Sequence, residues 1–565
     1  MADSSRLKVV LCWHMHQPEY RDLTTGEALL PWTYLHAIKD YADMAAHLEA
    51  APASAAVINF SPVLLLQLEA YAEQLGAHLI HGAPLKDALL ASLAPDGIPD
   101  DTAGREHLIR ACLKVNRERI IERFGPFRQL AALAAGFLEP DAVRYMAREF
   151  LVDLTVWYHL GWLGEAVRRS DARVAMLMKK ERHYSDADRR TLLEVIGELI
   201  TGIVPRYRAL AAGGRVELSV TPFGHPILPL MLDFKAARDA VPDCPLPAES
   251  GYPGSEARVR WHLEEAIAQF EKIFGFRPQG CWPSEGAVSD SALRFIEQAG
   301  FRWAATGELV LRHSLTRQKL WNDEEQVAYL HRAYRISGSP LKVYFRHDAL
   351  SDLIGFSYSK WHGDDAAANL THHLEHLADV FKGQSERVVA IVLDGENAWE
   401  YFPFNGYFFL SALYARISAS ARLELTTFSR CAEAAPATEI PSIVAGSWVY
   451  GTFTTWIGEV AKNRAWEMLC DGKRAYDEAV RAGQLTVDEQ DAAARQLAVC
   501  EGSDWCWWFG EANPAEQVAS FDGLYRRHLR NLFRLLKQSP PEYLSRPFAH
   551  GSGSPEMGGV MRRAQ

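Results

Sequence analysis

Residues 388–397 read VVAIVLDGEN, six apolar residues that lead directly into Asp394, Gly395, Glu396 and Asn397. A continuous apolar run without polar alternation is typical of a parallel strand that is buried on both faces. A carboxyl group at the end of such a strand is costly unless it is paired or used. The stretch therefore predicts a buried strand with a chemically active tip, and an aspartate that merely caps a turn is the structural alternative.

The same pattern recurs along the chain. Six further apolar runs end in polar or chemically useful side chains, at 7–15, 56–60, 216–221, 280–282, 303–306 and 343–346. Helical patterns lie between them, at 255–274, 289–300 and 365–381. Strand, polar tip and helix in repeated order predict an α/β fold, a (β/α) barrel whose chemistry collects at the C-terminal ends of its strands.

Two regions break this alternation. Residues from about 80 to 212 and from about 455 to 540 read almost wholly helical. We therefore expect a barrel domain over residues 1–435, with the first helical region inserted between its second and third strands. A C-terminal helical domain over 436–545 is expected to contribute to the cleft, and the Gly/Ser-rich tail 546–565 to be flexible.

Composition excludes several classes of function. The 565 residues carry 60 Lys and Arg against 71 Asp and Glu, a net charge of −11, which argues against nucleic acids and anionic membranes as partners. No apolar stretch is long enough to span a membrane, the N-terminus lacks a signal-peptide pattern, and the eight cysteines have no metal-binding spacing. We expect a cytoplasmic protein with reduced thiols. The 16 tryptophans are numerous, and we expect those near the polar tips to line a sugar cleft.

A second carboxyl group stands in an equivalent position. Glu285 follows the short run 280–282 and precedes a helix that begins near Ser289. An acidic residue that complements the helix dipole is the structural alternative. Glu285 and Asp394 together, on different strands at one face, are what glycoside hydrolysis requires. One carboxyl group attacks or steadies the anomeric carbon in its ionised form, while the other holds a proton for the leaving oxygen.

Two other clusters suggest ligand binding. His14 and His16 lie two residues apart at a strand end and so face the same side; they suit a metal or sugar hydroxyl groups, with His225 and His347 as further candidate ligands. An equally good interpretation is that these histidines are structural, with ring nitrogens that hydrogen-bond within the fold and bind no ligand. The acidic, tryptophan-dense segment 504–511 suits stacking on sugar rings, although a core-packing helix start has the same composition.

These segments resemble the five motifs of glycoside hydrolase family 57, in order. They are HMHQP at 14–18, HPILP at 225–229, GCWPSE at 280–285, LDGEN at 393–397 and DWCWW at 504–508. The resemblance implies a distorted (β/α)7 barrel with a helical domain, and a retaining mechanism on α-glucans without metal or cofactor. It implies Glu285 as nucleophile and Asp394 as general acid/base. The substrate-binding residues expected on this basis are His14, His16, Gln17, His225, Trp282, Glu396, Trp399, Trp456, Asp504 and Trp507.

The segments DGENAWE, FRHDALSD and DWCWWFG look like the amylopullulanase and α-amylase side of the family. We therefore expect hydrolysis of α-1,4 and possibly α-1,6 bonds in soluble α-glucans or maltodextrins. A 4-α-glucanotransferase or branching enzyme would use the same two carboxyl groups. A zinc-dependent α-mannosidase or deacetylase on a related barrel, and a non-catalytic glucan-binding protein, are the remaining alternatives.

Overall fold

A ring of seven parallel strands forms the centre of the computed structural model, which describes residues 6–139 and 142–553. β8 lies beside β1, and β2, β3, β4, β5 and β7 follow in order. One parallel bridge, between Arg346 at the end of β7 and Ala390 of β8, closes the ring. The strands are β1 (Leu7–Met15), β2 (Ala56–Phe60), β3 (Val216–Val220), β4 (Gly280–Cys281), β5 (Trp303–Thr306), β7 (Lys342–Phe345) and β8 (Val388–Asp394). The predicted α/β barrel is confirmed, and each predicted apolar run holds one strand.

Three short strands distort the barrel. β9 (Leu423–Leu425) pairs with the first residues of β1, where β2 does not reach. β6 (Tyr334–Ile336) pairs antiparallel with β7, and β10 (Thr438–Ile440) extends that edge. Each has only three residues, too few for an apolar run, and none of them was predicted from the sequence. Side chains such as Val10, Trp303 and Tyr344 fill the barrel interior, which is therefore a packed core.

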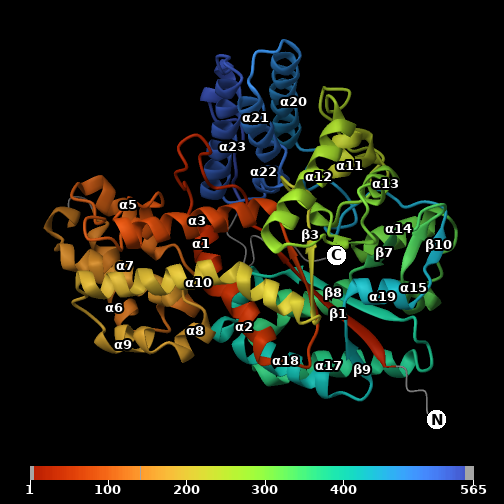
Figure 1. Cartoon of the computed structure of the whole chain (residues 1–565), viewed down its shortest axis with the longest axis horizontal. Coiled ribbons are helices and arrows are strands. Elements are labelled where there is room, and N and C mark those ends of the chain that lie inside the picture. The colour runs from red at the N-terminus through yellow and green to blue at the C-terminus, as the bar shows by residue number, and fades with distance from the viewer. Residues whose placement is uncertain (1–5, 140–141, 554–565) are drawn as a thin grey trace.

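Helices surround this sheet (Figure 1). α12 (Ser255–Phe274) and α17 (Gly363–Val380) follow the predicted helical patterns closely. α13 (Asp290–Gln298) begins as predicted, because the Ser289 hydroxyl accepts a hydrogen bond from the backbone N–H of Ala292. α3 (Pro62–His81) starts directly after β2, and α18 (Tyr407–Ala419) packs on α17.

The two helical regions lie on different sides of the barrel (Figure 1). Between β2 and β3 the chain forms α4 (Ala88–Ala91), α5 (Thr102–Leu113), α6 (Gly125–Phe137), α7 (Arg148–Trp162), α8 (Glu165–Ser170), α9 (Ala172–Lys180) and α10 (Asp186–Ala212). The C-terminal region contains α20 (Val460–Arg481), α21 (Val487–Cys500), α22 (Asp504–Trp508) and α23 (Ala515–Leu535). α21 and α20 both pack against α23.

The C-terminal residues return to this helical region. Phe548 packs on Phe509, with ring centroids 5.0 Å apart, and Ala549 is buried. The first residues of the predicted flexible tail are therefore packed, while 554–565 fall outside the described residues. All eight cysteines are free and buried. Within the described ranges, no helix is long and apolar enough to cross a membrane.

Candidate active site

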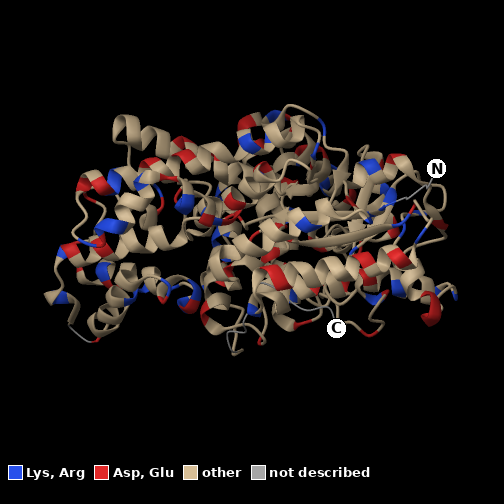
Figure 2. Ribbon diagram, turned by 90° about the horizontal axis from the view of Figure 1, so that it is seen from below, with Lys and Arg blue, Asp and Glu red and all other residues tan. Residues whose placement is uncertain are grey.

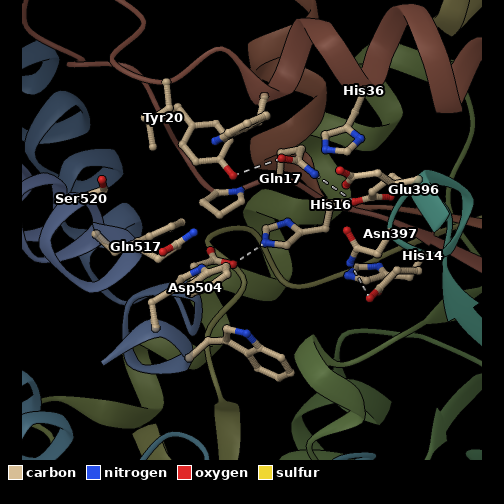
Figure 3. A pocket seen from close by; sticks show the side chains of 18 of the residues that line it. His14, His16, Gln17, Tyr20, His36, Glu396, Asn397, Asp504, Gln517 and Ser520 are labelled. Atoms are coloured by element: carbon tan, nitrogen blue, oxygen red, sulfur yellow. Dashed lines mark hydrogen bonds and ion pairs between the residues drawn. The ribbon is translucent and has the colours of Figure 1, made fainter. Parts of the chain in front are cut away.

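A cavity of about 670 Å³ opens at the C-terminal ends of the barrel strands. Segments far apart in the sequence form its walls, including the tips of β1 and β8 and parts of both helical regions. In Figure 3, His16 and Asp504 point toward one another across it, and the Gln17 side chain reaches Glu396. The predicted site residues that line the cavity are His14, His16, Gln17, His225, Glu285, Asp394, Glu396, Asp504 and Trp507.

Glu285 lies four residues after the end of β4, in a left-handed backbone conformation with φ 58° and ψ 22°. This conformation costs a residue with a Cβ atom about 1–2 kcal/mol. Trp448 holds it in place: its backbone N–H donates to the Glu285 carbonyl oxygen at 3.0 Å. Its indole N–H donates to Oε2 of Glu285, also at 3.0 Å. The Ser503 hydroxyl donates to Oε1 at 3.4 Å, so a residue before α22 also contacts this carboxyl group.

Asp394 is the last residue of β8, where its Oδ2 accepts a hydrogen bond of 2.9 Å from Nδ2 of Asn397. Burial raises the pKa of Asp394 to about 6. Burial and the charge of Asp394 together raise the pKa of Glu285 to about 8. Because the two groups act on one another, these values belong to the pair. At pH 7 these pKa values favour a protonated Glu285 and an ionised Asp394.

The three histidines stand beside these carboxyl groups. Nε2 of His14 lies 3.1 Å from Nε2 of His225, whose Nδ1 lies 2.8 Å from the Ser503 hydroxyl. Burial lowers the pKa of His14 to about 3 and that of His225 well below its usual value, so both rings are neutral. A chain of hydrogen bonds thus runs from the barrel interior through Ser503 to Glu285.

Residues 10–444 match the model of the family described as Glycosyl hydrolase family 57. The chain belongs to this family. The match covers the first four predicted motifs, and the fifth, at 504–508, lies beyond it.

Solved structures support the family 57 fold. The GH57 branching enzyme from Thermococcus kodakaraensis has a TM-score of 0.56 at 16% identity, over 94% of this chain and 90% of that one. The GH57-type branching enzyme from Pyrococcus horikoshii has a TM-score of 0.56 at 14% identity, over 98% and 97%. The α-amylase AmyC from Thermotoga maritima has a TM-score of 0.55 at 12% identity, over 94% and 93%. Comparison with curated proteins gave no match.

In this family 57 site the ring nitrogens of His14, His16 and His225 lie within 4.8 Å of one another, close enough for the three to be considered as metal ligands. The three rings are within 9–18° of parallel, and His16 stacks on His225 with centroids 3.7 Å apart. Nitrogen lone pairs lie in the ring plane, so parallel rings do not direct them at one ion. Asn59 contacts Nδ1 of His14 and Ser61 contacts Nδ1 of His16, while Nε2 of His16 is taken up by Asp504. His347 packs on His331 and does not line the cavity.

Three predicted sugar-binding tryptophans of this family 57 chain lie behind the cavity wall. Trp282 packs inside the barrel against Trp448, and Trp456 contacts Trp507 from behind. The Trp399 indole donates to the carbonyl oxygen of Gly395, the residue after Asp394. All three are at most 1% exposed. They pack behind the residues that line the cavity. Of the tryptophans near the motifs, some are therefore core residues and others, such as Trp448, Trp507 and Trp508, line the cavity.

The structure adds lining residues that the sequence did not indicate. Trp32 and Trp162, whose ring centroids are 6.2 Å apart, form an aromatic corner with Lys114 and Asn116 from the inserted helices. Arg346, which closes the barrel, also lines the cavity. Arg346 belongs to the FRHDALSD segment quoted above, whereas Trp32, Trp162, Lys114 and Asn116 belong to none of the quoted family 57 segments. Trp32 begins α1 (Trp32–His36), between β1 and β2, whereas Trp162, Lys114 and Asn116 reach the site only because the insertion packs against the barrel.

Proposed function

We propose that this chain is a retaining glycosidase of α-glucans, with Glu285 as nucleophile and Asp394 as general acid/base. The observation that carries the proposal is the pair itself: two partly buried carboxyl groups, one after β4 and one at the end of β8, line a single cavity, and the charge of Asp394 raises the pKa of Glu285. A double displacement needs one ionised and one protonated carboxyl group, and this pair holds a single proton near neutral pH.

In the proposed reaction, Glu285 attacks the anomeric carbon while Asp394 gives its proton to the leaving glycosidic oxygen. A β-glucosyl enzyme forms, and Asp394 then removes a proton from water, which releases a product of α configuration. In the resting site Glu285 has the higher pKa and holds the proton. Positive charge that develops at the anomeric carbon favours the ionised Glu285, so substrate moves the proton toward Asp394.

The residues that line the cavity suit a neutral polymer of sugars. Trp448, which contacts Glu285, and Trp507 and Trp508 line the cavity, and so do Trp32 and Trp162. Aromatic faces of this kind pack against the C–H faces of pyranose rings. Histidine, glutamine and carboxyl groups beside them suit hydroxyl groups, as proposed for His14, His16, Gln17, His225, Glu396 and Asp504. In Figure 2 the basic and acidic positions alternate along the ribbon of the described residues, in keeping with a substrate that is not a polyanion.

Soluble α-glucans and maltodextrins with α-1,4 bonds are the proposed substrates, with α-1,6 bonds as a second target. The structures similar to this chain include branching enzymes and an α-amylase, so transfer to a sugar hydroxyl and transfer to water are both chemistries of this fold. Incubation with maltotriose separates the two. We expect only shorter products, whereas longer oligosaccharides would assign transfer.

The roles of the two carboxyl groups can be tested with maltosyl fluoride, which needs no acid to leave, and azide. Glu285→Ala leaves room for azide on the β face, so we expect a β-glycosyl azide. Asp394→Ala still forms the glycosyl enzyme, and azide then gives an α-glycosyl azide. The opposite pair of products would exchange the two roles, and the absence of azide products from both variants would overturn the mechanism.

A further inference from the structure

The side chain of Arg346, the residue after β7, holds the tip of β8 in place. Its Nε donates to the carbonyl oxygen of Val392 at 2.9 Å, and the backbone N–H of Val392 donates to the Ser351 hydroxyl at 3.3 Å. Val392 is fully buried, so both of its backbone groups need a partner. Past the bridge between Arg346 and Ala390, the two side chains therefore take the place of a paired strand, two residues before Asp394.

The guanidinium group of Arg346 is held in one orientation. Nη1 donates to Asp348 and Nη2 to Asp352, each at 2.7 Å, and both carboxyl groups belong to α16 (Asp348–Asp352). The side chain is buried as well. One planar fork thus binds three acceptors and fixes their relative positions, a geometry that the ammonium group of a lysine does not reproduce.

The same guanidinium group lies over the indole ring of Trp448, 5.7 Å from the ring centroid. Trp448 is the residue whose indole N–H donates to Oε2 of Glu285. A cation over the face of an indole attracts the ring and so favours one orientation of it. Arg346 therefore contacts two groups that adjoin the carboxyl pair, Val392 on the strand of Asp394 and Trp448 beside Glu285.

Arg346 also brings a positive charge to an acidic cavity. Of the described lysines and arginines, only Arg346 and Lys114 line the cavity, and Lys114 is exposed and pairs with Glu516 on α23. The charge of Arg346 lowers the pKa of Asp394, although burial has the larger, opposite effect.

The other titratable groups that act on the guanidinium group are acidic or neutral: Asp348, Asp352, Glu308 and His347. Burial lowers the pKa of His347 to about 3, so its ring carries no charge at neutral pH. α16 packs on β8. Loss of the Arg346 charge would therefore leave the carboxyl groups of α16 uncompensated near Asp394, and the pKa of Asp394 would rise.

We propose that Arg346 is a positioning residue of the carboxyl pair: its fork aligns the tip of β8 with Trp448, and its charge offsets the acidic groups around Asp394. This inference rests on the proposed function, since the pair is the proposed catalytic one. In this role Arg346 acts through Val392 and Trp448, without contact to the reacting atoms.

Two substitutions separate the fork from the charge. Arg346→Lys keeps the charge but not the fork, so we expect kcat/KM on maltopentaose to fall by about 10- to 100-fold, with both limbs of the pH profile in place. Arg346→Gln also loses the charge, so we expect a larger fall, and both limbs should move to higher pH by about 1. Limbs that stay in place in Arg346→Gln would overturn the inference.

Arg387→Lys and Arg387→Gln are the matched controls. Arg387 directly precedes β8 at the other end of the strand, is also buried, donates to the carbonyl oxygen of Ala328 and lies over the ring of Phe381. At a temperature where they are folded, these variants should keep the wild-type limbs and most of the activity. Should Arg346→Gln not fold, Arg346→Lys decides, because a loss no larger than that of Arg387→Lys would contradict the alignment.

Infrared titration reads the Asp394 carboxyl group without a sugar. The C=O band that Asp394→Asn removes should titrate near pH 6 in the wild-type protein and at higher pH in Arg346→Gln. The same midpoint in both proteins would overturn the inference. If the wild-type protein does not turn over maltopentaose, the proposed function fails, while the infrared midpoints still decide whether Arg346 acts on Asp394.

Discussion

Trp448 donates two hydrogen bonds of 3.0 Å to Glu285, one from its backbone N–H to the carbonyl oxygen and one from its indole to Oε2. The first stabilises the left-handed backbone of Glu285, and the second stabilises its ionised carboxyl group. The bridge between Val288 and Gly446 attaches the same two segments just beside this contact. The segment after β10 therefore orients the proposed nucleophile, although it contributes no strand to the barrel ring.

Trp448→Phe is expected to lower kcat/KM by about 10- to 100-fold, the value of one hydrogen bond to a charged group. The indole N–H lowers the pKa of Glu285, so its loss raises that pKa and moves the alkaline limb of the pH profile to higher pH. Initial rates on a maltooligosaccharide, measured against pH, check both effects. Trp321→Phe controls for the loss of a tryptophan, because the Trp321 indole N–H donates to Asp323 and the residue does not line the cavity. A fall in rate without a shift of the limb would contradict the electrostatic role.

The wild-type protein is expected to show a bell-shaped dependence of kcat/KM on pH, with limbs near 6 and 8. Below the lower limb both carboxyl groups are protonated and no nucleophile is available. Above the upper limb both are ionised and no acid remains. The limbs belong to the coupled pair, so Asp394→Asn, measured on an activated fluoride, should remove the alkaline limb. If the activity of the wild-type protein rises through pH 6 and shows no alkaline limb, then the two carboxyl groups do not share a proton as proposed.

Ser503→Ala removes the hydroxyl group that lies 2.8 Å from His225 and 3.4 Å from Glu285. We expect kcat/KM to fall by about 3- to 10-fold, as for one neutral hydrogen bond. Ser520→Ala is the matched control, because Ser520 lines the same cavity but hydrogen-bonds to Glu516. Equal effects of the two substitutions would show that the histidine chain does not act on Glu285.

The barrel was predictable from sequence because its strands are buried on both faces and therefore read as unbroken apolar runs; even β4, with two residues, is marked by its polar tip. The short strands β6, β9 and β10 have no such run, since each pairs at an edge. The motif residues with polar side chains line the cavity, but Trp282, Trp399 and Trp456 are core residues. A tryptophan beside a strand tip packs inward or outward according to the neighbours that fold against it. For the same reason the sequence did not indicate Trp32 or Trp162, which reach the cavity only through helix packing.

Gly280 is the position where β4 tolerates no side chain. A Cβ atom there would lie 1.8 Å from Cε2 of the Trp303 indole. That indole cannot move away easily, because its N–H donates at 2.6 Å to Glu217 and its ring packs on Phe428. We expect Gly280→Ala to destabilise the protein by about 1–3 kcal/mol, as overpacking of a core does.

Calorimetry should therefore give a lower thermal midpoint for Gly280→Ala. At a temperature where this variant is still folded, its activity should also be reduced, because Gly280 lies in β4 shortly before Glu285. Gly76→Ala is the matched control. Gly76 lies within α3, and a Cβ atom there meets nothing within 4 Å. Alanine is the better helix former by about 1 kcal/mol, so this substitution should raise the midpoint. Equal midpoints for the two variants would mean that β4 can shift to accept a side chain, and the close contact between Gly280 and Trp303 would then not be what positions Glu285.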